Sequence, residues 1–102
     1  MIGTSYQRFF QTLANENRLK IIHFLQVHDA RNVSEIVEGT NLEQTLVSHN
    51  LKRLHNCHFV EAKQNGKERI YSLNKTTIEP LLLLMDKHVN TYCVNCKADD
   101  HE

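Results

Sequence analysis

Apolar residues recur at helical spacing in the first third of the chain and predict two helices. Aromatic and aliphatic side chains return every three or four positions over residues 5–13, and again up to about residue 28. Asn15, between the two runs, is a favourable N-cap residue and marks the start of the second helix. We expect the buried stripe of that helix to contain Leu19, Ile22 and Leu25.

A capping pattern predicts a short third helix near the centre of the chain. Asn32 is followed three residues later by Glu35, which is the spacing of a capping box, so we expect a helix over residues 33–38. Gly39 is suited to end this helix, because glycine readily adopts the left-handed conformation that follows many helix C-termini.

The same kind of pattern opens a fourth helix. Asn41 with Gln44 repeats the capping spacing and predicts a helix that runs to about His58. Only three residues, one of them glycine, separate it from the third helix. Two helices joined by a short turn of this kind are typical of a helix-turn-helix, here over residues 33–58.

Two strand-like runs follow the fourth helix and predict a β-hairpin. The runs cover residues 59–63 and 68–73, and the dipeptide Asn65-Gly66 lies between them. Asn-Gly between two such runs is a strong signal for a tight hairpin turn. We therefore expect residues 59–73 to form a wing next to the helix-turn-helix.

The chain then returns to helical spacing. Thr76 and Glu79 are predicted to cap a last helix over residues 76–95, with a flexible acidic tail over residues 96–102. The four consecutive leucines at positions 81–84 cover all sides of this helix. Not all of them can face one small domain, so we expect some to face a second subunit.

These elements predict a mainly α (α+β) fold, a winged helix-turn-helix with about five helices and a two-stranded wing. We expect one domain over residues 1–102, forming a homodimer through its first and last helices. The composition is that of a soluble protein, with 40% hydrophobic and 24% charged residues, and no apolar run is long enough for a membrane span. Because the N-terminus lacks the apolar run of a signal peptide, we expect a cytoplasmic protein. Three widely separated glycines exclude a phosphate-binding loop, and we predict no enzymatic activity.

The net charge of zero conceals an uneven distribution. Residues 44–75 hold six basic and two acidic side chains, a net charge of +4. The segment before them has a net charge of −1 and the segment after them −3. The fourth helix and the wing therefore form a basic module, as expected of a nucleic-acid-binding surface.

The fourth helix has a polar arc suited to a DNA groove. At about 100° per residue, Val47, Leu51, Leu54 and His58 fall on one side and are expected to be buried. The opposite side carries short polar side chains and a long cation, which suit base edges and phosphates in a major groove. Wing cations would neutralise phosphates or enter the minor groove. The predicted DNA-binding residues are Gln44, Thr45, Ser48, His49, Lys52, Arg53, Lys67 and Arg69.

Three separate stretches resemble the ArsR/SmtB family of winged-helix repressors. Residues 13–22 (LANENRLKII) resemble the opening of that family's second helix, and residues 44–54 (QTLVSHNLKRL) resemble its recognition helix. Residues 59–73 resemble its wing. The resemblance implies a homodimer that binds operator DNA near a promoter and is released when an effector binds.

Members of that family place their effector sites at different points, and two known metal sites fit this chain poorly. One uses a Cys-x-Cys pair in the third helix, whereas residues 33–38 contain no cysteine. The other uses Asp-x-His on the last helix, with a histidine and a further histidine or glutamate about ten residues later, from the partner subunit. Asp86 and His88 match the first half, but Asp99 stands where the second histidine should be, with Glu102 following, and His101 comes two residues too late.

A third option for the effector site is thiol chemistry. Cys93-Val94-Asn95-Cys96 places two thiols on one helix face, where they suit zinc, cadmium or trivalent arsenic, or a disulfide. We expect Cys57 to be a partly buried core residue instead. Four interpretations stay open: an inert tail, a thiolate metal or metalloid site, an Asp/His metal site and a dithiol redox switch. The candidate residues are Cys93, Cys96, His88, Asp86 and His101.

The sequence thus predicts a sequence-specific transcriptional regulator that binds double-stranded operator DNA. We expect a repressor with no fixed cofactor, released by a metal ion, a metalloid or an oxidant acting near the last helix. One alternative is a winged-helix regulator that needs no ligand and has no metal site. The other is a protein-interaction module on the same scaffold, which the polar arc of the fourth helix disfavours.

Overall fold

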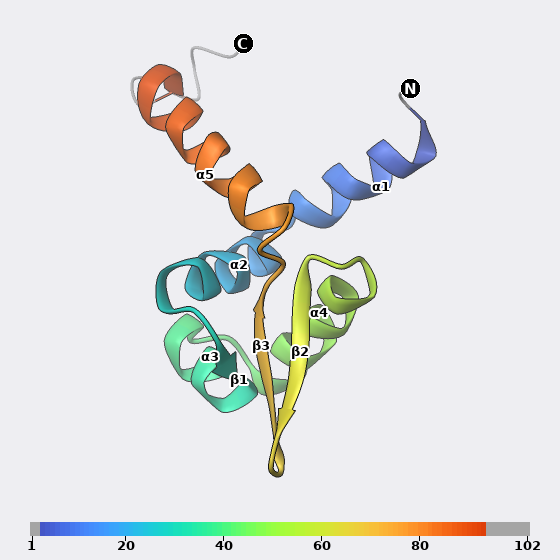
Figure 1. Cartoon of the computed structure of the whole chain (residues 1–102), viewed down its shortest axis with the longest axis vertical. Helices are drawn as coiled ribbons and strands as arrows, with labels where there is room; N and C mark the ends of the chain where they lie inside the picture. The colour runs from blue at the N-terminus through green and yellow to red at the C-terminus, as the bar shows by residue number, and fades with distance from the viewer. Residues whose placement is uncertain (1–2, 94–102) are drawn as a thin grey trace.

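The computed structural model of the chain describes residues 3–93, which fold as a winged helix-turn-helix (Figure 1). The elements in chain order are α1 (Thr4–Leu13), α2 (Glu16–His28), β1 (Arg31–Asn32), α3 (Val33–Thr40), α4 (Gln44–Asn56), β2 (Val60–Asn65), β3 (Glu68–Leu73), α5 (Ile78–His88) and a π-helical turn (Val89–Cys93). The three strands form one antiparallel sheet in the order β1-β3-β2. The predicted fold class is confirmed.

Figure 1 shows that a β-hairpin projects from one end of the molecule and two helices from the other. Helices α2, α3 and α4 gather around the upper part of the sheet, and the β2–β3 hairpin projects away from them at one end. At the opposite end α1 and α5 leave the body in diverging directions. The molecule is elongated, measuring 49 × 32 × 23 Å, because these projecting parts extend its long axis.

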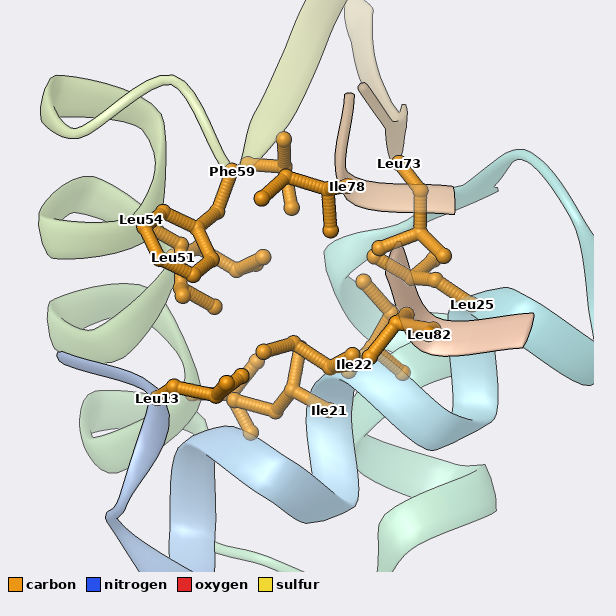
Figure 2. Close-up of a cluster of buried hydrophobic side chains, with 13 residues drawn as sticks. Leu13, Ile21, Ile22, Leu25, Leu51, Leu54, Phe59, Leu73, Ile78 and Leu82 are labelled. Atoms are coloured by element: carbon orange, nitrogen blue, oxygen red, sulfur yellow. The ribbon is translucent and has the colours of Figure 1, made fainter. Parts of the chain in front are cut away.

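One apolar core joins the central helices to the base of the hairpin. Figure 2 shows these side chains converging from α2, α4, the hairpin and the start of α5. On α2 the buried residues are Ile21, Ile22 and Leu25, whereas Leu19 is 41% exposed, so its predicted burial is wrong. The buried apolar residues are Leu13, Ile21, Ile22, Leu25, Ile36, Val47, Leu51, Leu54, Phe59, Val60, Leu73, Ile78 and Leu82.

Two of the predicted helix starts have the expected caps. The Asn15 side chain accepts a hydrogen bond from the backbone N–H of Arg18 at 3.0 Å and caps α2. Asn32 and Glu35 form a reciprocal capping box, because each side chain accepts from the other's backbone N–H, at 2.8 and 2.9 Å. Both signals are local, so the sequence alone located them.

The predicted boundary between α3 and α4 is wrong by two residues. Gly39 lies inside α3, and Asn41 ends that helix in the left-handed conformation with φ of 60°. Asn41 is therefore the C-cap of α3 and not the N-cap of α4, which Glu43 supplies without a side-chain hydrogen bond. Gly39 has a packing role: a Cβ atom there would overlap the ring of Phe24 on α2.

The sheet also differs from the prediction. β2 extends to Asn65, which pairs with Glu68, so the two-residue turn is Gly66-Lys67 with a positive φ of 65° at the glycine. Glycine at the first turn position suits a tight hairpin. β1 was not predicted, because two residues carry no readable period. It pairs with β3, and the Asn32 amide donates to a Glu68 carboxylate oxygen at 2.8 Å.

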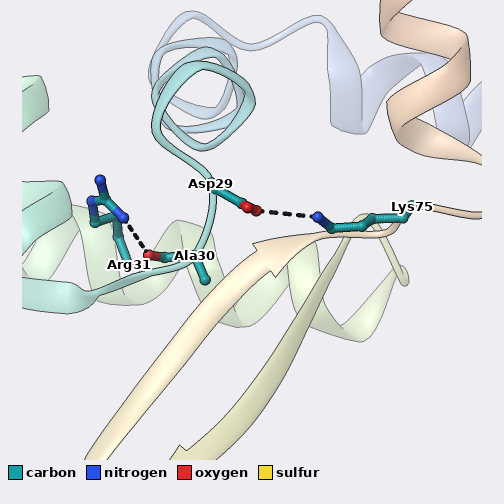
Figure 3. Close-up of polar contacts among 4 residues, drawn as sticks. All are labelled: Asp29, Ala30, Arg31 and Lys75. Carbon is teal, nitrogen blue, oxygen red and sulfur yellow. Dashed lines mark hydrogen bonds and ion pairs between the residues drawn. The ribbon is translucent and has the colours of Figure 1, made fainter.

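The last helix starts and ends differently from the prediction. α5 begins at Ile78, and the Asn74 side chain accepts from the backbone N–H groups of Thr76 and Thr77 just before it. An exposed ion pair of 3.2 Å between Lys75 and Asp29 ties the loop before α5 to the end of α2 (Figure 3). The helix ends at His88 and continues as the π-helical turn. The predicted tail over residues 96–102 lies outside the described residues.

Candidate nucleic-acid interface

The α4 helix has one buried and one exposed side, as the sequence predicted. Val47, Leu51 and Leu54 are fully buried and anchor the helix to the core. His58, placed on this stripe by the sequence, lies beyond the helix end and is exposed with φ of 62°, so that assignment is wrong. The five predicted polar residues all lie exposed on the opposite side: Gln44, Thr45, Ser48, His49 and Lys52.

The hairpin carries the second group of predicted DNA-binding residues. Lys67 is exposed in the turn at the tip, and Arg69 is exposed on β3 with its guanidinium 5.7 Å from the ring centre of Tyr71. Within residues 3–93, neither these two cations nor Lys52 has an ion-pair partner. Their charges are therefore available to phosphates.

In the described part of the chain, the side chain of Arg53, unlike those of the other predicted DNA-binding residues, bonds another part of the protein. It is exposed and lies at the flank of the polar arc, and its guanidinium donates to the hydroxyl of Thr12 at 3.5 Å. Arg53 therefore reaches toward the end of α1. The sequence did not indicate this contact, because 41 residues separate the two partners.

Sequence reasoning also missed three residues, Thr12, Arg18 and Asn50, which form what we call the α1–α4 joint. Thr12 and Asn50 are 1% and 4% exposed, and Arg18 lies between them. The Arg18 guanidinium donates to the Thr12 carbonyl at 2.7 Å and to the Asn50 side-chain oxygen at 3.1 Å. Burial lowers the pKa of Arg18, and the nearby charge of Arg53 lowers it further. The only signal in the sequence was an asparagine on the inward side of α4.

The candidate effector residues are only partly brought together. Asp86 and His88 are both exposed on α5; the Asp86 carboxylate accepts a hydrogen bond of 3.0 Å from Gln26, and the His88 ring lies 5.0 Å from that of Tyr92. Cys93 is half-buried at the end of the π-helical turn. Cys96 and His101 lie outside the described residues, as does Asp99.

No preformed metal site is present in the part of the chain from Gly3 to Cys93. There, no three histidine, cysteine or carboxylate side chains gather closely enough to hold an ion. Cys57 is exposed, which contradicts its predicted partial burial, and its sulfur lies 3.9 Å from the Thr12 hydroxyl. Among the described residues, 3–93, no helix is long and apolar enough to cross a membrane.

The comparison with protein families matches residues 15–62 to bacterial regulatory proteins of the arsR family. This segment runs from the cap of α2 through the helix-turn-helix into the wing. It contains Arg18, Asn50 and all predicted DNA-binding residues of α4.

Several bacterial regulators are similar over most of the chain. A probable mercury resistance operon repressor of Streptomyces lividans is 35% identical over 76% of this chain, which spans 61% of that relative. The transcriptional repressor PagR of Bacillus anthracis is 32% identical over 74% of this chain and 76% of its own length. The cadmium resistance regulatory protein CadC of Listeria innocua is 34% identical, with coverages of 84% and 70%.

Solved structures agree with the fold. The homodimeric winged helix-turn-helix DNA-binding domain of Mb0332 from Mycobacterium bovis, described as a possible ArsR-family transcriptional regulator, superposes with a TM-score of 0.79 and 27% identity, covering 87% of this chain and 82% of its own. The crystal structure of PagR gives a TM-score of 0.70 and 30% identity, with coverages of 79% and 92%. The chain therefore belongs to the arsR family of bacterial regulatory proteins and is a winged-helix DNA-binding transcriptional regulator, not an enzyme.

Proposed function

We propose that this protein is a dimeric repressor that inserts α4 into the major groove of operator DNA and sets the wing on the adjacent backbone. The observation that carries the proposal is the polar side of α4, exposed from Gln44 to Lys52 and backed by a fully buried apolar stripe. A helix held in this way presents its first turns to base edges. The wing cations without ion-pair partners supply the contacts to phosphate.

Exposed apolar residues on α1 and α5 support a homodimer. Among the described residues, eight large apolar side chains are exposed, and six of them lie on α1, α5 and the π-helical turn. Residues of this size are rarely left in water together unless another surface covers them. They are Tyr6, Phe10, Leu83, Leu84, Val89 and Tyr92.

We further propose that the protein works in the cytoplasm. We also propose that an effector acts at the end of the last helix. Soft thiolates at Cys93 and Cys96, with His88 or His101 nearby in sequence, suit zinc, cadmium or a trivalent metalloid, or oxidation to a disulfide. The mercury and cadmium resistance regulators among the relatives favour a metal. Asp86 is a weaker candidate, because its carboxylate is already engaged by Gln26.

Selection from a library of random duplexes tests the DNA-binding proposal. We expect enrichment of an inverted repeat, since a two-fold symmetric dimer presents two identical α4 helices. The two half-sites should lie about one DNA turn apart, roughly 34–36 Å between centres. Enrichment of no sequence, with binding that depends only on salt concentration, would contradict a sequence-specific regulator.

Titration of the operator complex tests the effector proposal. Under reducing conditions, zinc, nickel, cadmium and arsenite are added separately, and the released fraction is followed by fluorescence anisotropy. A coupling of about 1–3 kcal/mol lowers operator affinity by roughly 5–150-fold, and we expect this for at least one soft ion. Cys93→Ser with Cys96→Ser should abolish that response, whereas Cys57→Ser should not. Release by an oxidant alone would favour the dithiol switch, and no release at all would contradict an effector site.

A further inference from the structure

Arg18, in the first turn of α2, caps the C-terminal end of α1. The last four carbonyl groups of a helix lack partners within it. In α1 the carbonyls of Phe10 and Leu13 accept from the next backbone N–H groups, of Ala14 and Asn15. The remaining two are satisfied by the Arg18 guanidinium, which donates to Thr12 at 2.7 Å and to Gln11 at 3.3 Å. A cation at this end of a helix is also favoured by the helix dipole.

The same guanidinium holds the recognition helix. Its third bond goes to the Asn50 side-chain oxygen at 3.1 Å, and the Asn50 amide donates to the Leu46 carbonyl at 2.9 Å. Arginine has donors only, so this pair of bonds fixes the orientation of the asparagine amide. Asn50 is 4% exposed and every buried side-chain nitrogen or oxygen within residues 3–93 has a partner, so the α1–α4 joint is fully satisfied.

The joint lies between two surfaces with different tasks. α1 carries exposed apolar residues of the proposed dimer interface, and α4 carries the proposed operator-binding side. Figure 1 shows α1 projecting from the body and attached to it by its C-terminal end. Gln11 and Thr12 lie in this last turn of α1. Arg18, on α2, bonds both this end of α1 and Asn50 on α4. Besides the apolar packing of Phe9 and Leu13 against the core, Thr12 is also linked to α4 and its C-cap by the longer Arg53 bond and by a 3.9 Å contact with Cys57.

We propose that Arg18, acting through Asn50, is a positioning residue that sets the orientation of α4 relative to the dimer helix α1. This inference rests on the proposed function. In a dimer, a change of that orientation alters the separation of the two α4 helices and hence the match to half-site spacing. The joint thereby determines specific operator affinity, whereas non-specific affinity depends on exposed cations.

A series of operators with altered spacing tests this role. Three duplexes carry the same half-sites at the preferred spacing and with one base pair added or removed, which moves a half-site by about 3.4 Å. We expect the wild-type dimer to lose about tenfold or more in affinity at the altered spacings. Arg18→Lys and Asn50→Leu should each flatten this preference to within about threefold, and the double variant should be no flatter than either single variant.

Two further variants control for charge and shape. Asn50→Asp keeps the acceptor for Arg18 and loses only the donor to the Leu46 carbonyl, a bond within α4, so it should retain the spacing preference. Arg31→Lys, whose guanidinium bonds only the neighbouring Ala30 carbonyl within residues 3–93, should behave as wild type. For each variant we would measure the dimer dissociation constant and the affinity for a random duplex. A urea titration shows beforehand that the variant is folded under the conditions of these measurements.

The possible outcomes separate the two proposals. Folded, dimeric Arg18→Lys and Asn50→Leu proteins that keep the full spacing preference would overturn the positioning role. So would an equal loss of affinity for all three operators and for the random duplex, because that pattern indicates a general loss of DNA contacts. If the wild-type protein binds no operator or ignores spacing, the proposed function fails and this inference fails with it.

Discussion

A variant in which Ser48 and Lys67 are both replaced by glutamate is expected to lose about a thousandfold in operator affinity while remaining a folded dimer. Both side chains are exposed, one on the polar side of α4 and the other in the hairpin turn. Each specific contact is worth about 1–3 kcal/mol, and the dimer makes every contact twice, so the total loss is at least about 4 kcal/mol. The two glutamates also repel the phosphates that the serine and lysine would meet.

The physical reason for expecting an intact fold is the position of these residues. Within residues 3–93, the side chains of Ser48 and Lys67 make no hydrogen bond or ion pair and lie outside the apolar core. Substitutions at such sites usually change stability by no more than about 0.5 kcal/mol. Fluorescence anisotropy with the selected operator measures affinity, and analytical ultracentrifugation measures the dimer. Urea titration confirms that both proteins are folded at the concentrations used.

A matched variant separates position from charge. Lys20→Glu with Thr76→Glu introduces the same change of charge at exposed sites on α2 and before α5. Lys20 loses a 3.8 Å pair with Glu16, which is worth little because both side chains are largely exposed. We expect this control to lose less than about tenfold in operator affinity, through long-range charge alone. Equal losses in the two double variants would show that α4 and the wing are not the operator surface.

The features of this surface that could be predicted from the sequence are those formed by residues close together in the chain. The polar side of α4 follows from periodicity, because Val47, Leu51 and Leu54 at helical spacing force the intervening residues outward. Asn15 and Asn32 act within three residues of themselves, so their caps were also readable.

Errors arose where a distant residue decided the local structure. The ring of Phe24 lies against Gly39, so the glycine serves close helix packing inside α3, although its local signal was that of a helix end. Arg53 contacts Thr12, and Arg18 contacts Asn50 32 residues away, which no spacing rule indicates. β1 exists because β3 offers it an edge. Such features depend on tertiary packing, which overrides local propensity.

Replacing Leu84 by aspartate is expected to convert the protein to a monomer at micromolar concentration. α5 packs Ile78 and Leu82 into the core, and Leu84, 66% exposed, lies on its outward side. Burial of a leucine contributes about 1.5–3 kcal/mol, and a two-fold interface contains two copies. Burying the aspartate in the interface would also remove its charge from water without an oppositely charged partner. Dimer affinity should therefore fall by at least about a thousandfold. Phe10→Asp on α1, at 59% exposure, should have a similar effect.

Val27→Asp supplies the control for this prediction, because Val27 is an equally exposed apolar residue, at 61%, on α2 rather than on the projecting helices. Sedimentation equilibrium of the three variants therefore distinguishes a specific interface from general surface hydrophobicity. If Val27→Asp dissociates the protein and Leu84→Asp does not, the dimer forms through α2. Monomeric Leu84→Asp should still bind random duplexes weakly, since its α4 and wing cations are unchanged, but should lose the preference for an inverted repeat. That combination would show that sequence recognition requires two copies of α4 held at a fixed separation.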